Sequence, residues 1–261
     1  MAIVAAMRLM VLMSIAVSLA AGQARAGETA CWFENGAVVV SAAFGDIAGD
    51  FILDLSAPRS QLHDTAAQSH GVETDSARRD LILAGETLHD FEMPVIDLDA
   101  RSAAFVTSIN GVLGADALAP FVIDIRFSPC VVTLYRRTPG RAAGSIRLKV
   151  RQVAGAPAMA AAISDGMESR QGWFAIDTGS LGTRIAGASL SRTPPKGADP
   201  ASPSVRLRAL SLGGRLFEQP PAGLMKDAPA GLDGAIGNAI WSRYRLRLDI
   251  RGGWLDLTPD P

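Results

Sequence analysis

The 261-residue chain is poor in histidine and cysteine, and this shortage argues against a metal centre. It has 3 histidines and 2 cysteines. The histidines are His63, His70 and His89, and none falls in a ligand spacing such as His-Glu-x-x-His. His63 and His70 are expected on a surface helix and at its end. The sequence therefore predicts no bound metal.

The short motifs of several large enzyme classes are also missing. The chain has no Gly-x-Ser-x-Gly elbow of a serine hydrolase, no phosphate-binding Gly-Lys-Ser/Thr loop and no dinucleotide fingerprint. No organic cofactor is implied by the residues that remain.

An excess of positive charge is likewise absent. The 25 Lys and Arg residues are balanced by 26 Asp and Glu residues. Binding to nucleic acid usually needs a concentrated basic face, so no nucleic-acid partner is expected. Arg243, Arg245 and Arg247 alternate along a predicted strand and share one face, which fits either a solvated surface or a contact with an acidic partner.

Long hydrophobic runs are missing after residue 26. Before it, Arg8 precedes an apolar stretch from Leu9 to about Ala21, and Ala24-Arg25-Ala26 has the small-x-small pattern of a cleavage site. These features predict a secretory signal peptide over residues 1–26, cleaved after Ala26, and a periplasmic or secreted protein. No later segment approaches the roughly 20 apolar residues of a spanning helix, so no membrane span is expected after cleavage.

The two cysteines, Cys31 and Cys130, both follow the predicted cleavage site. In an exported protein we expect them to form a disulfide. On the chain-entropy account, closing a loop of about 100 residues stabilises a fold by as much as ~4 to 5 kcal/mol. Two buried free thiols are the alternative.

Short apolar runs broken by Gly, Pro, Asp and Ser recur along the chain, which is typical of an all-β protein. The predicted strands, paired as hairpins, cover residues 36–44 with 50–54, 81–85 with 88–96, 122–126 with 130–135, 146–153 with 158–163, and 245–250 with 254–257. Short helices are predicted over 115–118 and 238–244. Residues 136–145 have the composition of a linker, and residues 191–204 that of a surface loop near the lobe interface.

The most informative pattern occurs twice, 123 residues apart. Phe51-Ile52-Leu53-Asp54 and Phe174-Ala175-Ile176-Asp177 are both apolar runs that end on an aspartate. Asn110-Gly111-Val112-Leu113-Gly114 and Asp233-Gly234-Ala235-Ile236-Gly237 form a second pair at the same spacing. Two copies of one unit in one chain predict a two-lobed molecule.

These segments resemble the aspartic proteases, and more narrowly the bacterial relatives with retropepsin-like lobes. Asp177-Thr178-Gly179 matches the motif of that family in full, and Gly114 and Gly237 each end an apolar-apolar-Gly step. In the first copy, Leu55 and Ser56 replace the threonine and glycine that follow the aspartate.

The resemblance implies an all-β fold of two similar β-barrel lobes with short helices and an active cleft between them. The lobes are expected at residues 27–140 and 141–261. It further implies an exported aspartic endopeptidase, a monomer, that acts on protein or peptide substrates without a cofactor.

In such an enzyme, Asp54 and Asp177 hold one water and share a proton, one acting as base and the other as acid. Thr178 and Gly179 support Asp177, with Ser180, Leu55, Ser56, Gly114 and Gly237 as the remaining active-site support. Leu55 cannot make the hydrogen bond of a threonine, and Ser56 would be strained if its φ were positive. No Gly-rich flap hairpin is recognisable within residues 64–75.

The degenerate first motif leaves two other functions open, a catalytically inactive protein that binds extended peptides or an envelope partner, and an envelope structural protein that keeps only the scaffold. Geometry separates the enzyme from the binder. Carboxylates of Asp54 and Asp177 within hydrogen-bonding or water-bridging reach favour the enzyme. An Asp54 held in an ion pair, or a Leu55 side chain that fills the space beneath the pair, favours the binder.

Overall fold

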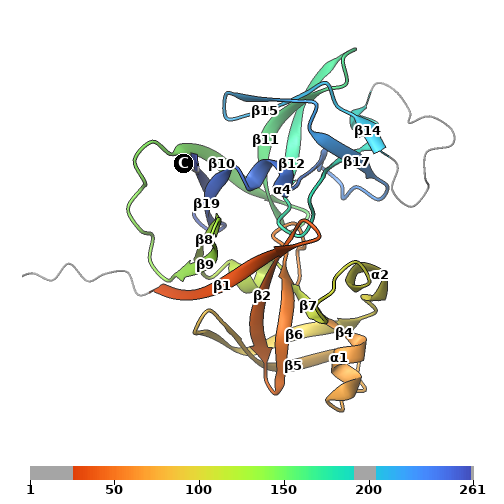
Figure 1. Ribbon diagram of the computed structural model, residues 1–261, viewed down its shortest axis with the longest axis vertical. Coiled ribbons are helices and arrows are strands. Elements are labelled where there is room, and N and C mark those ends of the chain that lie inside the picture. The colour runs from red at the N-terminus through yellow and green to blue at the C-terminus, as the bar shows by residue number, and fades with distance from the viewer. Residues whose placement is uncertain (1–25, 191–203, 260–261) are drawn as a thin grey trace, which may run out of the picture.

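The structure is a computed structural model that describes residues 26–190 and 204–259. The chain is mostly β, and Figure 1 shows two lobes, one above the other, joined by strands at one side. The predicted all-β, two-lobed fold is confirmed. The predicted signal peptide, apart from Ala26, and the predicted loop at 191–204, apart from Ser204, lie outside the described residues. The division after residue 140 stays a prediction.

The first half of the chain contains nine strands and three short helices among the described residues. They are β1 (Ala26–Glu34), β2 (Ala37–Phe44), β3 (Ile47–Leu53), β4 (Gln61–His63), α1 (Asp64–Ser69), β5 (Ser76–Leu83), β6 (Glu86–Ile96), α2 (Asp99–Ser102), β7 (Ile109–Leu113), α3 (Ala115–Leu118), β8 (Val122–Phe127) and β9 (Cys130–Tyr135).

The second half repeats much of this order. It comprises β10 (Ile146–Val153), β11 (Ala156–Ser164), β12 (Ser169–Ile176), β13 (Thr183–Ala186), the 3-10 turn η1 (Gly187–Ser189), β14 (Ser204–Arg206), β15 (Ala209–Leu212), β16 (Arg215–Glu218), β17 (Pro221–Met225), β18 (Gly234–Ile236), α4 (Asn238–Trp241), β19 (Tyr244–Asp249) and β20 (Trp254–Pro259).

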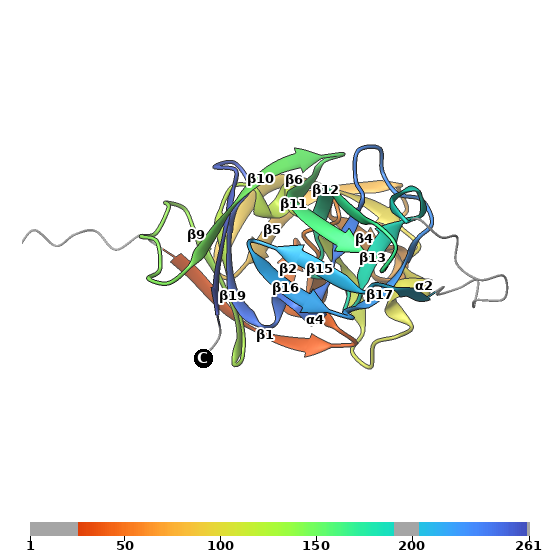
Figure 2. The ribbon, with the colours of Figure 1, turned by 90° about the horizontal axis from the view of Figure 1, so that it is seen from above.

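A central sheet takes strands from both halves. Its antiparallel order is β1, β9, β8, β19, β20, β10, and the two halves meet where β8 pairs with β19, with Leu246 opposite Ile125. Figure 2 shows these strands gathered at one side of the molecule. The far ends of β1 and β10 leave the central sheet and pair with β2 and β11 in their own lobes. One long strand of each half thus runs from the shared sheet into its own lobe.

Both lobes use the same strand arrangement to hold an aspartate. In the first lobe β3 lies parallel to β7, and β7 pairs antiparallel with β4. In the second lobe β12 lies parallel to β18, and β18 pairs antiparallel with β13. Asp54 follows β3 and Asp177 follows β12 directly. The two aspartates therefore occupy equivalent positions at the strand ends that face the junction of the lobes.

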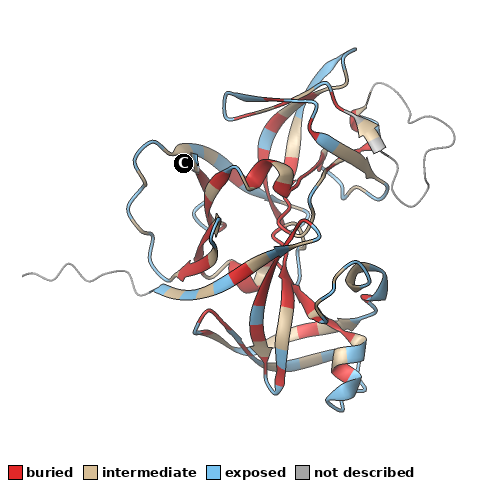
Figure 3. Cartoon of the chain, viewed as in Figure 1, coloured by how far each residue is buried: buried red, intermediate tan, exposed pale blue. Residues whose placement is uncertain are grey.

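Burial on both faces explains the unbroken apolar runs of the inner strands. Val38 and Val40 of β2 pack in the main hydrophobic cluster, whereas Val39 packs in a second cluster on the opposite face of the strand. Phe51 and Ile52 of β3 divide between the same two clusters. The buried residues of both lobes extend to the point where the lobes meet (Figure 3). A strand covered on both faces loses the alternation of a half-exposed strand.

The disulfide between Cys31 and Cys130 is confirmed. It joins the middle of β1 to the start of β9, with the two Cα atoms 4.9 Å apart and 99 residues between them in sequence. A disulfide is typical of proteins from oxidising compartments such as the periplasm or the extracellular space. Among the described residues no helix is long and apolar enough to cross a membrane.

Two local predictions need correction. The helix expected over 238–244 ends at Trp241, because Tyr244 already pairs with Pro259 as the first residue of β19. His63 is buried rather than on a surface helix, and its side chain caps the N-terminus of α1. His70, by contrast, is the exposed C-cap of α1, as predicted.

The alternating arginines of β19 are also more enclosed than a solvated face. The carboxylate of Asp124 on β8 accepts hydrogen bonds from the Nε atoms of Arg245 and Arg247, at 2.7 and 2.8 Å. Arg247 is 8% exposed and Asp124 is 1% exposed. Their acidic partner is thus within the chain, across the seam between the two halves of the central sheet.

Candidate active-site cleft

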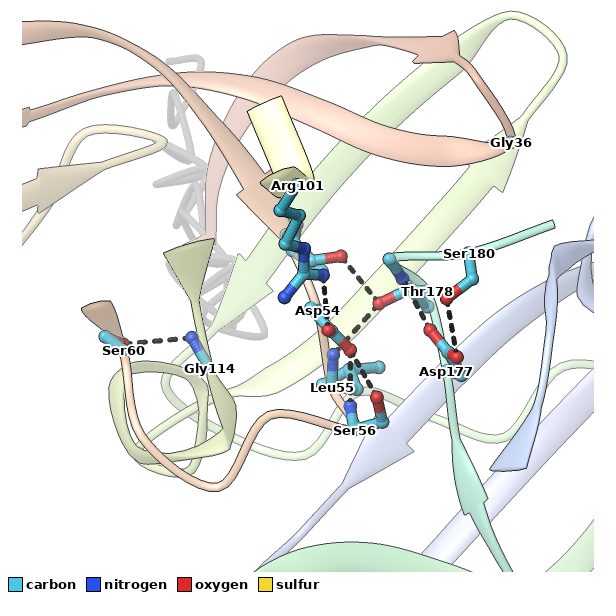
Figure 4. Close-up of polar contacts among 12 residues, drawn as sticks. Gly36, Asp54, Leu55, Ser56, Ser60, Arg101, Gly114, Asp177, Thr178 and Ser180 are labelled. Atoms are coloured by element: carbon cyan, nitrogen blue, oxygen red, sulfur yellow. Dashed lines mark hydrogen bonds and ion pairs between the residues drawn. The ribbon is translucent and has the colours of Figure 1, made fainter. Parts of the chain in front are cut away.

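The backbone around the two aspartates is nearly the same in both lobes. The amide of Asp54 donates to the carbonyl of Leu113 at 2.9 Å, and the amide of Asp177 donates to the carbonyl of Ile236, also at 2.9 Å. Each bond links an aspartate to the last residue of the neighbouring strand. In Figure 4 the two carboxylates lie on neighbouring loops.

Asp177 is fully buried and receives three hydrogen bonds to its carboxylate. Oδ1 accepts from the amide of Gly179 at 3.0 Å. Oδ2 accepts from the Ser180 hydroxyl at 2.8 Å and from Nη2 of Arg184 at 2.7 Å. Gly179 and Ser180, both named from the sequence as active-site support, thus donate to Asp177, and Arg184 adds a charge that the sequence did not predict.

Asp54 is 3% exposed and is held by a different set of donors. Oδ1 accepts from both the amide and the hydroxyl of Ser56, at 2.8 and 2.7 Å, and Oδ2 accepts from Nη2 of Arg101 at 2.6 Å. Figure 4 shows Arg101 reaching Asp54 from α2. The φ of Ser56 is not positive, so the strain considered for this serine does not arise. Its hydroxyl instead supplies a donor that glycine lacks.

A single threonine hydroxyl links the two aspartate loops. Oγ1 of Thr178 donates to the carbonyl of Leu53 at 2.7 Å and accepts from the amide of Leu55 at 3.0 Å. The side chain of Leu55 offers no hydroxyl in return. It is fully buried in the main hydrophobic cluster. Only the second lobe therefore supplies a side-chain hydroxyl to the link between the lobes.

Asn238 reinforces that link from the second lobe. Its Nδ2 donates to the carbonyls of Thr178 and Gly36, at 2.8 and 2.9 Å. The amide of Val38 donates to the same Thr178 carbonyl at 3.0 Å. We did not identify Asn238 from the sequence. The available signal was the residue after the apolar-apolar-Gly step, which is Asn238 in the second copy but Ala115 in the first.

The two predicted glycines of that step allow close backbone packing beneath the loops. A Cβ on Gly114 would lie 2.7 Å from the carbonyl oxygen of Ala57, and one on Gly237 would lie 2.3 Å from that of Gly182. The amide of Gly114 also donates to Oγ of Ser60 at 2.9 Å. Both glycines therefore leave space for the backbone of the aspartate loops, which a side chain at either position would block.

The loops of the two lobes touch at the floor of a pocket. A Cβ on Gly179 would lie 2.7 Å from the Asp54 carboxyl carbon and 2.5 Å from Nη2 of Arg101. The pocket above has a volume of about 330 Å³. It is lined by Asn35, Asp54, Arg101, Phe105, Gly179, Ser180, Leu181 and Arg184.

The pKa values of the two carboxyl groups are shifted in opposite directions. Burial, and then the charge of Asp54, raise the pKa of Asp177 to about 6, against the opposing effect of Arg184. Burial also raises the pKa of Asp54, but the charge of Arg101 and the hydrogen bonds from Ser56 outweigh it and the net pKa is lowered. The surroundings thus favour the ionised form of Asp54 and the protonated form of Asp177.

One further group of titratable side chains lies beside α2. His63, Asp64 and Asp99 bring ligand atoms within 4.8 Å of one another. Asp64 faces Nδ1 of His63 at 2.8 Å, whereas Asp99 faces Nε2 at 3.4 Å. The Asp99 side chain is 79% exposed, and exposed acidic groups commonly gather without a metal, so no metal site is assigned to this cluster.

No protein-family model and no curated protein match the sequence. Solved structures do match, and among them is the aspartic proteinase from Irpex lacteus. It has a TM-score of 0.55 and 14% sequence identity, over 90% of this chain and 97% of that chain. A likeness at this identity concerns the fold. The chain therefore has an aspartic-proteinase-like fold.

Proposed function

We propose that this protein is an exported, aspartic-proteinase-like protein whose cleft binds an extended peptide and does not cleave it in the arrangement described. The ion pair between Arg101 and Asp54 carries the proposal. A base must reach the proton that it abstracts, and the Asp54 oxygen not bound by Ser56 is bound by Arg101 at 2.6 Å.

Three features support a peptide as the ligand. The fold is similar to that of an aspartic proteinase over nearly the whole chain. A pocket lies where the aspartate loops of the two lobes meet. Leu181 and the partly buried Phe105 give this pocket apolar walls next to polar groups, as is usual for binding sites.

Endopeptidase activity is the second candidate, and the opposite pKa shifts favour it. If Arg101 moved aside, Asp54 could take a proton from a water that attacks a peptide carbonyl, while protonated Asp177 donates toward the carbonyl oxygen. The bonds from Gly179 and Ser180 would hold Asp177 in place. Thr178 would keep the two loops together.

Cleavage of an unfolded protein mixture from pH 3 to pH 8 separates the two candidates. The wild type is expected to cleave no more than Asp177→Asn, while both bind labelled peptides. Cleavage by the wild type that is lost in Asp177→Asn and blocked by a statine-type transition-state mimic would instead establish the endopeptidase. Arg101→Ala and the double variant Arg101→Ala/Asp177→Asn show whether removing the ion pair releases activity that depends on Asp177.

We further propose a periplasmic or secreted location after removal of residues 1–26, supported by the disulfide. One chain supplies both aspartate loops, so the cleft needs no second copy. We therefore propose a monomer with lobes at 27–140 and 141–261, which mass measurement in solution and limited proteolysis of the 136–145 linker would test.

A further inference from the structure

The cleft presents two arginines to a ligand while it buries the aspartates that they pair with. Side-chain exposure is 32% for Arg101 and 42% for Arg184, against 4% for Asp54 and 0% for Asp177. Asp177 is not among the residues that line the pocket. A ligand in this pocket therefore meets more cationic than anionic surface.

Both guanidinium groups retain donors for a ligand. Each carries five N–H groups in a planar fork. Among the described residues, Arg101 donates to the side chain of Asp54 alone and Arg184 to that of Asp177 alone, each through Nη2. The buried Nε of Arg184 has no partner at all within the described chain. The described residues thus leave most of the donors of the two guanidinium groups unused.

The two arginines approach the pocket from opposite lobes. Arg101 stands on α2 of the first lobe and Arg184 on β13 of the second. Nη2 of Arg101 lies close to Gly179, in the loop that carries Asp177. An acceptor group placed between the lobes can therefore engage both forks, and a carboxylate matches their geometry because it has two oxygens.

From these observations we infer that the cleft recognises a carboxylate of the bound peptide, either an Asp or Glu side chain or the free C-terminus. The inference rests on the proposed peptide-binding function and specifies its ligand. Phe105 and Leu181 would pack on the apolar part of the residue that bears the carboxylate. Besides the two arginines, the polar side chains that line the pocket are Asn35, Ser180 and Asp54, whose charge Arg101 neutralises. An amide of the same shape has one acceptor oxygen and no charge, so it should bind more weakly.

The test is the binding of fluorescein-labelled peptides of sequence Ala-Ala-Leu-Phe-X-Leu-Ala-Ala, followed by fluorescence anisotropy. One peptide has Glu at X and an amidated end, one has Gln and an amidated end, and one has Gln and a free carboxylate. The Glu peptide or the free-carboxylate peptide is expected to bind about tenfold or more tightly than the amidated Gln peptide, since hydrogen bonds to charged groups are the stronger ones. Tighter binding of the Glu peptide would identify a side-chain carboxylate as the ligand, and tighter binding of the free-carboxylate peptide would identify the C-terminus.

Arg184→Gln and Arg101→Gln are expected to remove that preference, whereas Arg215→Gln, at an exposed position of β16, should retain it. Circular dichroism shows whether each variant folds. Should the Gln variants fail to fold, Arg184→Lys keeps the charge and is expected to lose most of the preference, because lysine lacks the planar fork.

Equal binding of all three peptides would overturn the carboxylate inference and leave peptide binding intact. A preference that survives in folded Arg184→Gln and Arg101→Gln together would overturn it as well. Failure of every peptide to bind would remove both the inference and the peptide-binding proposal.

Discussion

Asp54 and Asp177 occupy equivalent places in the two lobes, yet their neighbours shift the pKa values of their carboxyl groups in opposite directions. Two hydrogen bonds from Ser56 and the ion pair with Arg101 favour the ionised form of the Asp54 carboxyl. Asp177 is the more deeply enclosed and lies near a second negative charge, so its proton is held more tightly. The residues that follow each aspartate thus matter as much as the aspartate itself.

The raised pKa of Asp177 should appear in the pH dependence of stability. Its folded-state pKa is about 6, whereas the ordinary pKa of an aspartate is 3.8. Its contribution to stability is therefore fully present below the unfolded pKa and is lost as the pH rises through about 6. We expect the unfolding free energy of the wild type to fall by about 2 to 3 kcal/mol relative to Asp177→Asn between pH 4 and pH 7, measured by urea unfolding.

The exposed Asp227 provides the matched control, since Asp227→Asn should track the wild type across this range. A constant difference between the wild type and Asp177→Asn from pH 4 to pH 7 would contradict the buried, proton-holding role of Asp177.

Thr178 and Leu55 are the residues that follow the two aspartates. Because only Thr178 supplies a hydroxyl to the link between the lobes, its side chain should contribute the larger polar stabilisation. Thr178→Val keeps the shape of the side chain but leaves the Leu53 carbonyl and the Leu55 amide without their buried partner. We expect a loss of about 2 to 4 kcal/mol in unfolding free energy. Thr87→Val, on β6, should change it by less than about 0.5 kcal/mol, and an equally small effect at Thr178 would show that the link is dispensable.

The sequence predicted some of these residues and missed others for a physical reason. Asp177, Gly179 and Ser180 interact within three residues of one another, so a local motif describes them. Arg101 reaches Asp54 across 47 residues. Such a contact depends on how separate elements pack, and no local spacing records it.

Among the elements, α2 decides where Arg101 lies. It has only four residues, and a helix of that length is not stable alone. Its N-cap residue Leu98 is 7% exposed and packs in the second hydrophobic cluster with Ile109 and Val112. The ion pair at Asp54 therefore depends on apolar packing a few residues away.

Leu98→Ala should loosen α2 without disturbing the second lobe. We expect faster amide hydrogen exchange over residues 99–103, unchanged exchange in β12, and a loss of about 2 kcal/mol or more in stability from the cavity. Leu216→Ala, at a side chain that is 64% exposed, serves as the control. Unchanged exchange in α2 would mean that other contacts hold Arg101 in place.

At the scale of elements, the sequence-based prediction succeeded for hairpins and failed where a side chain turns inward at an element end. Strands β8 and β9 are found within one residue of the predicted bounds, because their apolar pattern and flanking turns are local. His63 was placed on the surface, but β4 enters the sheet beside β6 and β7 and takes this histidine inside. In the segment where a flap hairpin was not recognised, the chain forms α1.

At the scale of the whole molecule, the shared sheet couples the two lobes. Asp124 on β8 pairs with Arg245 and Arg247 on β19, and Leu246 and Leu248 beside them are fully buried. An interface built from paired strands and a buried core resembles the interior of one domain more than a contact between two.

We accordingly expect Asp124→Ala to destabilise both lobes together. It leaves Arg247 buried without its carboxylate, which typically costs 3–5 kcal/mol. Tryptophan fluorescence, with Trp32 in the first half and Trp241 in the second, and far-UV circular dichroism should report one shared unfolding midpoint, shifted to lower urea in the variant. Separate midpoints for the two signals in the wild type would show that the lobes unfold independently.

The way the central sheet is assembled has a practical consequence for engineering. The segment 136–145 is largely exposed and joins β9, which lies within the sheet, to β10 at its edge. A chain cut there would yield two fragments that can recognise each other through β8 and β19, and each fragment would carry one aspartate loop. The protein could then serve as a split reporter whose ligand cleft forms only when the two fragments reassociate.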